Sequence, residues 1–273
     1  MSQLAAEQEA YEIQEVWDPD WFSESDHERF RLLASLIPGD CNSMLDVGCG
    51  NGMFLDHVTQ ERSWERICGV DRSQEALAHV RHDKMTADVN SLPFDDNEFD
   101  IVSCQEVLEH LPEATFEGAV SEICRVARKA ALISVPYNEN LRRSQIECPY
   151  CQTRFHPDYH MRSFDDKCMS NLLVGQNFQA VDVRKLRPLR VSWHYHLLHR
   201  EKSRRSQQDF PSFAICPTCH YKNTERISED LDARRRTNEA APQTGAVQRL
   251  KRLLIPSFES CRWIAGLYCP MDQ

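Results

Sequence analysis

The sequence predicts an α/β fold built on a doubly wound, mostly parallel sheet. Short apolar runs alternate with amphipathic stretches along the chain, which is the pattern of strand–helix–strand units. The first clear run, residues 44–47, breaks into three glycines at alternate positions, Gly48, Gly50 and Gly52. Glycines directly after a strand allow a sharp turn and a close approach of the backbone to a ligand. A stretch that can form a helix follows, so these residues open a nucleotide-binding unit.

The remaining elements follow in the order that this fold requires. We expect an N-terminal helical cap over residues 1–40, in which a helix at 24–36 is closed by Pro38 and Gly39. Further strands are expected at 67–71, 84–88, 99–104, 130–135 and 178–186, and further helices at 53–58, 73–81, 116–128 and 165–175. Because strands and helices alternate, helices should cover both faces of the sheet.

Two of the later apolar runs end in a carboxylate. Asp71 follows the glycine turn by about 20 residues, where dinucleotide-binding folds place a ribose-binding acid. Asp88 ends the next run. The glycine spacing is G-x-G-x-G, which differs from the G-x-G-x-x-G of dinucleotide-binding proteins. The alternative is that each acid only caps the helix or turn that follows it.

The fourth run, residues 99–104, is followed by Gln-Glu-Val-Leu-Glu-His-Leu-Pro at 105–112. With these four blocks in this order, the chain resembles class I S-adenosylmethionine-dependent methyltransferases over about residues 43–183. The resemblance is to the type 11 group, which includes quinone C-methyltransferases and many small-molecule and sugar O-methyltransferases. It implies a Rossmann-like sheet of seven strands, and we place its seventh, antiparallel strand near residues 213–215.

The resemblance also implies which residues contact S-adenosylmethionine. They are Asp46, Gly48, Cys49 and Gly50 for the methionine part, Asp71 with the adjacent Arg72 for the ribose, Asp88 and Val89 for the adenine, and Gln105 and Glu106 for the sulfonium end. Asp71 would accept from both ribose hydroxyls, and such charge-assisted hydrogen bonds are the stronger class. The cofactor has no phosphate, and the glycine turn contains no Lys or Arg.

Two Cys-Pro-x-Cys knuckles indicate a metal site. Cys148 and Cys151 form the first, and Cys216 and Cys219 form the second. Four thiolates complete a tetrahedral Zn²⁺ shell and leave no open position, so the site would be structural. If residues 212–216 form the seventh strand, however, the second knuckle lies at the opposite edge of the sheet unless the chain folds back. A rival shell is therefore local and consists of Cys148, Cys151, His156 and His160.

Two histidines are candidates for the chemistry of the acceptor. His160 lies in a His-x-Arg-x-Phe stretch that, in the resembled group, helps to close the substrate pocket. His110 follows the fourth strand, and an imidazole can act as a base near neutral pH. For both residues the alternative is a packing role. The aromatic and basic residues at 193–199 could line a sugar or ring substrate, or could belong to a packed helix.

The net charge of −10 is unevenly distributed. Residues 1–183 have a net charge of −18, which argues against a nucleic-acid partner, whereas residues 184–262 have a net charge of +9. We divide the chain into the cap, a methyltransferase domain at 41–221 with Cys-x-x-Cys insertions at 148–164 and 216–219, a flexible linker at 222–246, and an amphipathic segment at 247–273.

The amphipathic segment suggests a contact with a membrane surface. Basic and apolar residues alternate over 247–267, and Pro256 should divide them into two short helices. Such helices can lie in a membrane interface, or can dock on their own domain or on a partner. The sequence has no apolar run long enough to span a bilayer, and its polar N-terminus does not resemble a signal peptide. Twelve cysteines without such a signal indicate reduced thiols or metal ligands, so we expect a cytoplasmic protein, peripheral at the inner face of the membrane.

These features favour a methyltransferase that acts on an oxygen of a small or lipid-linked glycan-type acceptor. C-methylation of a quinone-type ring is the alternative, as is a non-catalytic cofactor-binding scaffold with a zinc-stapled interaction surface. No Asn-Pro-Pro-Tyr stretch of the kind seen in adenine and amide N-methyltransferases follows the fourth strand, where residues 104–107 read Cys-Gln-Glu-Val. This difference argues against methylation of nucleic-acid bases.

Overall fold

The computed structural model describes residues 3–192, 210–223, 226–239 and 257–271. A seven-stranded sheet has the order β3-β2-β1-β4-β5-β9-β8. The strands are β1 (Ser43–Val47), β2 (Arg66–Asp71), β3 (Asp83–Thr86), β4 (Phe99–Gln105), β5 (Ala127–Pro136), β8 (Phe178–Ser192) and β9 (Ser257–Pro270). The first five pair in parallel, and β9 runs antiparallel to both β5 and β8. The predicted doubly wound, mostly parallel sheet is confirmed.

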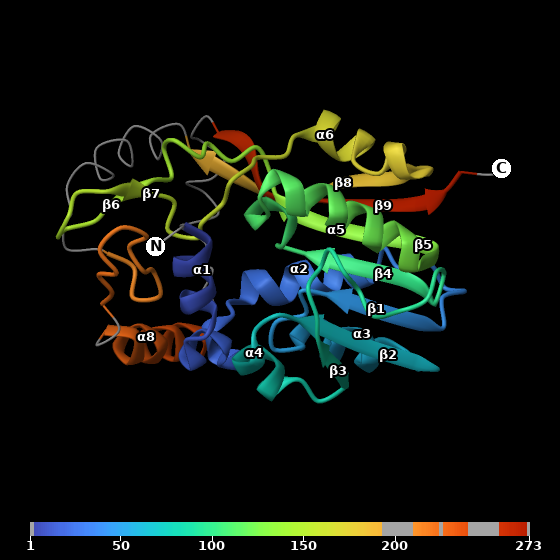
Figure 1. The fold of residues 1–273 in the computed structure, drawn as a ribbon, viewed down its shortest axis with the longest axis horizontal. Coiled ribbons are helices and arrows are strands. Elements are labelled where there is room, and N and C mark those ends of the chain that lie inside the picture. The colour runs from blue at the N-terminus through green and yellow to red at the C-terminus, as the bar shows by residue number, and fades with distance from the viewer. Residues whose placement is uncertain (1–2, 193–209, 224–225, 240–256, 272–273) are drawn as a thin grey trace.

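Helices cover both faces of this sheet (Figure 1). Apolar residues of α2 (Glu24–Ala34), α3 (Met53–Glu61) and α4 (Gln74–His79) pack in one buried cluster, whereas those of α5 (Glu113–Val126) and α6 (Asp166–Asn171) pack in another. Side chains of β1 alternate between the two clusters: Met44 belongs to the first, and Leu45 and Val47 belong to the second. This alternation explains why the buried strands are apolar on both faces.

The carboxyl ends of the parallel strands lie at one edge of the sheet, where α/β folds bind their ligands. The glycine turn follows β1, Asp71 ends β2, and a short helix η3 (Leu108–His110) follows β4. Strand β3 ends at Thr86, so Asp88 lies just beyond it in a tight turn that an isolated bridge to Ser91 closes. The four sequence blocks therefore meet at the same edge.

The seventh strand is not at 213–215, as we had expected, but at β9. Three of its side chains, Trp263, Ile264 and Ala265, are almost completely buried between β5 and β8. Residues 257–267 therefore form a strand inside the sheet, so the predicted membrane-surface helix is wrong for them, and the apolar side chains of Trp263, Ile264 and Leu267 are covered by the protein itself. Residues 247–256 lie outside the described residues, as does the aromatic segment 193–199.

The predicted flexible linker is also partly wrong. Residues 227–239 of the predicted range 222–246 form α8 (Ile227–Glu239). Its Arg235 pairs with Asp18 and Asp20 at 2.9 Å, and the Arg234 guanidinium lies 4.2 Å from the centre of the Trp21 ring. These contacts with the N-terminal segment order a stretch whose composition alone suggested a linker. Because β9 joins the sheet, the domain also extends beyond the predicted limits of 41–221.

A small subdomain lies beside the sheet and joins it through α1 (Gln3–Tyr11). It contains the hairpin of β6 (Ile146–Glu147) and β7 (Arg154–Phe155) and the segment that carries the second knuckle. Ala6 and Ala10 of α1 pack with Phe155 and Tyr159 in its core. Short helices η1 (Gln14–Trp17) and η2 (Pro19–Trp21) lead from α1 towards α2, and η4 (Val174–Gln176) precedes β8. In the described part of the chain, no helix is long and apolar enough to cross a membrane.

Candidate functional site

The glycine turn after β1 has the backbone conformation that its sequence predicts. Gly48, Gly50 and Gly52 have φ values of +72°, +54° and +81°, a region that residues with a Cβ rarely adopt. A Cβ at Gly48 would lie 2.3 Å from the Val107 side chain, and one at Gly50 would lie 2.8 Å from the Trp17 ring. Glycine is thus required here both by the turn and by the close approach of neighbouring side chains.

Asp71 fastens this turn to the end of β2. Its carboxylate accepts hydrogen bonds from the N–H groups of Gly50 and Ser73, each at 2.9 Å. Burial raises the pKa of Asp71 from its usual value, and these two hydrogen bonds oppose that shift. The alternative role for Asp71, as a cap of the next helix, is therefore partly correct. Ser73 is the N-cap of α4 and accepts from the Ala76 N–H, and Asp71 in turn accepts from the Ser73 N–H. The carboxylate nevertheless faces a cavity.

Two adjoining cavities lie along this edge of the sheet. The first, the β2 cavity, has a volume of about 430 Å³, and the second, the β4 cavity, about 500 Å³. Tyr11, Trp17, Gly48, Glu106 and His110 line both of them. The residues predicted to bind the cofactor are divided between them: Asp71, Arg72, Asp88 and Val89 line the β2 cavity, and Asp46, Cys49, Gly50 and Gln105 line the β4 cavity. The structure thus brings all of these residues together.

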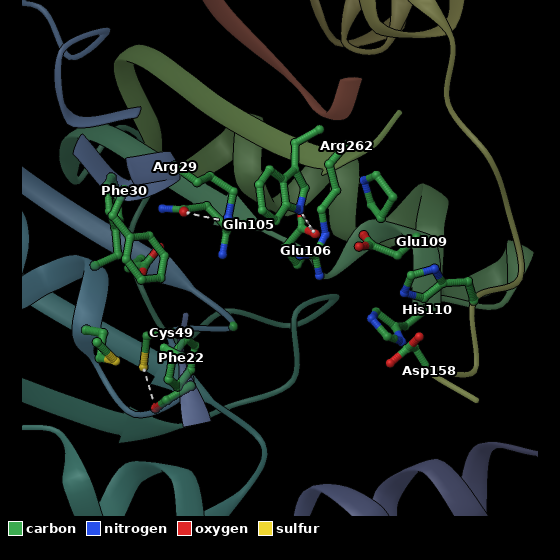
Figure 2. A pocket seen from close by; sticks show the side chains of 18 of the residues that line it. Phe22, Arg29, Phe30, Cys49, Gln105, Glu106, Glu109, His110, Asp158 and Arg262 are labelled. Carbon is green, nitrogen blue, oxygen red and sulfur yellow. Dashed lines mark hydrogen bonds between the residues drawn. The ribbon is translucent and has the colours of Figure 1, made fainter. Parts of the chain in front are cut away.

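The β4 cavity places opposite charges near the glycine turn. Asp46 is only 3% exposed and accepts from the Ser103 hydroxyl, and its burial raises its pKa to about 7. Arg29 of α2, only 5% exposed, donates to the Gln105 side chain at 3.3 Å, and its Nε has no hydrogen-bond partner among the described residues. Figure 2 shows Arg29 and Gln105 facing the cavity together. Sequence reasoning missed Arg29, although it lies on the apolar face of its helix beside Phe30 and Leu33.

Glu106 connects β4 with β9, the strand that we had expected near residues 213–215. It has a φ of +55°, a strained conformation for a non-glycine residue. Its N–H donates to the Ser134 carbonyl at 2.9 Å, and its carboxylate accepts from the Trp263 indole of β9 at 2.8 Å. Burial raises the pKa of Glu106. The side chain is therefore held at the boundary of the two cavities.

The two candidate histidines lie together in the β4 cavity. The rings of His110 and His160 are 4.7 Å apart, and the side chain of Glu109 joins them in a compact group (Figure 2 shows Glu109 and His110). Glu109 is fully buried, and neither of its carboxylate oxygens has a hydrogen-bond partner among the described residues. Burial raises the pKa of Glu109 and lowers that of His110.

A further carboxylate orients His160. The Glu139 carboxylate accepts from His160 Nδ1 at 2.5 Å and from His156 Nε2 at 3.0 Å. Sequence reasoning missed Glu109 and Glu139. The signals that could have found them are the Glu-His pair after β4 and the position of Glu139 just beyond the end of β5.

The four knuckle cysteines come together in the small subdomain. The Sγ atoms of Cys148 and Cys219 are 3.6 Å apart, and those of Cys151 and Cys216 are 3.5 Å apart. In each knuckle the N–H four residues after the first cysteine bonds back to that cysteine's carbonyl, at 2.9 Å for Gln152 and 3.0 Å for His220. The rival shell with His156 and His160 does not form: the two cysteines of the first knuckle group with those of the second, whereas both histidine rings bond to Glu139.

Comparisons with known proteins agree with this architecture. Residues 45–135 match the family of the methyltransferase domain. The chain is 28% identical over 131 residues to a ubiquinone biosynthesis O-methyltransferase of Azoarcus sp. strain BH72, covering 43% of this chain and 54% of that protein. It is 31% identical over 171 residues to a protein of Mycobacterium tuberculosis strain CDC 1551 that is named as an S-adenosylmethionine-dependent methyltransferase, covering 60% and 56%. The chain thus spans about half the length of the curated relatives it matches.

A solved structure shows the same fold at low sequence identity. It comes from the complex between the Haloferax volcanii Trm112 methyltransferase activator and a methyltransferase, and it matches with a TM-score of 0.54 at 15% identity, covering 92% of this chain and 91% of that chain. Residues 45–135 thus belong to the methyltransferase-domain family, and this solved structure shows that the Rossmann-like fold around them extends over most of the chain.

Proposed function

We propose that this protein transfers a methyl group from S-adenosylmethionine to a hydroxyl oxygen of a small-molecule acceptor. One observation carries the proposal: every residue that the sequence assigned to the cofactor lines one of two adjoining cavities at the carboxyl edge of the sheet. A fold alone does not assign a function, so the proposal depends on the charged residues that line the two cavities and on the ligand that they fit.

The charges of the two cavities suit the parts of the cofactor. In the β2 cavity, Asp71 would accept from the ribose hydroxyls and Asp88 from the adenine amino group. In the β4 cavity, Asp46 would pair with the ammonium group and Arg29 with the carboxylate of the methionine part. When bound, the cofactor supplies an already activated methyl group, so the protein must mainly position the acceptor and exclude water.

The acceptor would occupy the rest of the β4 cavity. Phe22, Phe30 and Trp263 provide apolar walls, while His110 and His160 provide polar groups that could face a hydroxyl and promote the loss of its proton. The names of the ubiquinone biosynthesis relatives favour an oxygen over a ring carbon as the methylated atom. A lipid-linked glycan-type acceptor, the other expectation from the sequence, loses the support of a membrane-surface helix at residues 257–267, where β9 lies instead.

Binding of the cofactor provides the first test. We expect calorimetry with the purified protein to show S-adenosylmethionine binding, and the Asp71→Ala change to weaken it by about 10- to 100-fold, which is the effect of losing hydrogen bonds to a charged group. Asp83→Ala, which removes an exposed carboxylate from the neighbouring strand β3, is the matched control and should leave the affinity unchanged. An absence of binding heat for the unaltered protein would refute the proposal.

We propose in addition that the four knuckle cysteines bind a structural Zn²⁺ ion. Their Sγ atoms all lie within 4.8 Å of one another, and the two closest pairs, at 3.5 and 3.6 Å, are near the spacing of about 3.8 Å that a tetrahedral shell with Zn–S bonds of about 2.3 Å requires. Cys148 and Cys216 are fully buried, as ligands in a closed structural site should be.

A further inference from the structure

We propose that Glu109, His110 and His160 bind a divalent metal cation, and that this cation holds two adjacent oxygens of the acceptor. The role towards the acceptor rests on the proposed methyl transfer, whereas the cation site can be tested independently. One ligand atom from each of the three side chains lies within 4.8 Å of those of the other two. Two imidazoles and a carboxylate form a known ligand set for catalytic divalent cations with open coordination positions.

Glu109 provides an observation that points to a ligand. Its side chain is fully buried, yet both carboxylate oxygens lack a hydrogen-bond partner among the described residues. Burial of a carboxylate without a partner is costly, so such groups in proteins are normally paired or coordinate a metal. Because Glu109 lines the β4 cavity beside His110 and His160, a cation bound there would satisfy it.

The surroundings of His160 suit a metal ligand. Its Nδ1 is engaged with Glu139, which leaves Nε2 as the nitrogen available to a metal. Ligating histidines commonly donate their other ring N–H to a carboxylate, which fixes the ring and its tautomer. Glu139 also holds His156, so its two oxygens are both occupied, and we assign Glu139 to orientation and not to the metal.

Backbone contacts fix the segment of His160 against the segment of Glu109. The Met161 N–H donates to the Glu109 carbonyl at 2.8 Å, and the Arg162 guanidinium donates to the Leu111 carbonyl at 2.7 Å. The three proposed ligands come from segments about 50 residues apart that these bonds hold in a fixed relation. A site of this kind is pre-organised before a ligand arrives.

The charges around the cluster favour a cation. Carboxylates outnumber guanidinium groups in the lining of this cavity, with Asp46, Glu106, Glu109, Glu139 and Asp158 against Arg29 and Arg262. Glu7, which is paired with Arg72, lies 3.5 Å from His110 Nδ1. Three protein ligands leave positions open for two acceptor oxygens, which identifies the acceptor class as a catechol, a vicinal diol or an α-hydroxy ketone. The cation would act as a Lewis acid that lowers the pKa of the bound hydroxyl.

Binding of Mn²⁺ to the full-length protein, followed by electron paramagnetic resonance, tests the site. Mn²⁺ prefers oxygen and nitrogen ligands to thiolates, so the knuckle cysteines should not compete. We expect one Mn²⁺ ion per chain, binding that is lost in Glu109→Gln and His160→Gln, and a loss of about 10- to 100-fold in affinity in Glu139→Gln. His82→Gln, which removes a histidine that pairs with Asp56 elsewhere on the surface, should bind as the unaltered protein does.

The outcome separates this inference from the proposed function. Asp71→Ala should lose the cofactor and keep Mn²⁺, whereas Glu109→Gln should lose Mn²⁺ and keep the cofactor, with unchanged thermal unfolding as evidence that it is folded. If the unaltered protein binds the cofactor but shows no saturable Mn²⁺ binding, or if Glu109→Gln binds Mn²⁺ as tightly as the unaltered protein, the cation site is wrong while the methyltransferase remains. Binding of Mn²⁺ without the cofactor would overturn only the proposed function.

Discussion

At the scale of single residues, the site depends on carboxylates held in surroundings that disfavour their charge. Asp46 is the clearest case, because among the described residues its one hydrogen-bond donor is the Ser103 hydroxyl and burial raises its pKa to about 7. Such a group is destabilising when it is ionised. It therefore contributes stability at low pH and loses this contribution as the pH rises through about 7. A bound ammonium group would lower the pKa of Asp46 again, because a nearby positive charge favours the ionised carboxylate.

We therefore expect cofactor binding to release protons. Between pH 5 and 7, up to about one proton should leave for each cofactor bound, and the affinity should rise with pH over the same range because the carboxyl must ionise to pair with the ammonium group. Calorimetry in buffers of different ionisation enthalpy measures the release. Asp46→Asn should abolish it. If the release persists in this variant, its source is another group, such as Glu7, whose pKa burial also raises to about 7.

At the scale of elements, α1 connects the cofactor site with the cysteine subdomain. Glu7 lines the β2 cavity, Tyr11 lines both cavities, and Glu7 pairs with Arg72 at 3.0 Å. On its other side α1 packs Ala6 and Ala10 into the subdomain core, and Gln3 donates to the Tyr159 carbonyl at 3.1 Å. The helix thus covers one cavity while the knuckle subdomain holds it in place.

Removal of α1 should weaken cofactor binding. For a protein that lacks residues 1–12, we expect at least a tenfold loss of affinity, about 1.4 kcal/mol, because the β2 cavity loses its cover and Arg72 loses its partner. Glu9→Ala removes only an exposed ion pair with Lys222 and should change the affinity little. The metal content of the truncated protein shows whether the subdomain survives, and an unchanged cofactor affinity in a truncated protein with full metal content would refute this role.

At the scale of the whole molecule, the cysteine cluster joins segments that are far apart in the sequence. Cys148 and Cys219 are separated by 71 residues, and the chain between them contains β7, α6 and β8. A metal that closes so long a loop restricts the unfolded chain, and its binding energy adds to the stability of the folded one.

We therefore expect one zinc per chain, and expect it to stabilise the subdomain. Elemental analysis of the purified protein should find it, and Cys148→Ser should lose it together with part of the thermal stability. Cys168→Ser, at an exposed cysteine outside the cluster, is the matched control and should keep both. A protein that is fully folded and free of metal would show that the cysteines serve another purpose.

The features that the sequence predicted correctly are those decided by residues close together in the chain. The glycine turn, Asp71 and the N-cap Ser73 each depend on residues within a few positions, and the structure has them where they were expected. Strand β9 was missed because its pairing with β5 and β8 is decided by residues far away in the chain, and its basic and apolar residues also suit an amphipathic helix. For the same reason α8 looked like a linker.

The sequence by itself determined the class of fold, the methyltransferase domain at residues 45–135 and the residues at the ends of the parallel strands, because each of these rests on short-range patterns of apolar residues, glycines and acids. Only the tertiary structure decided that the two knuckles meet, that Arg29 enters the site from α2, and that Glu109, His110 and His160 form one cluster. Those groupings arise where segments distant in the chain pack against the same edge of the sheet, and no local pattern specifies which distant partner a side chain will meet.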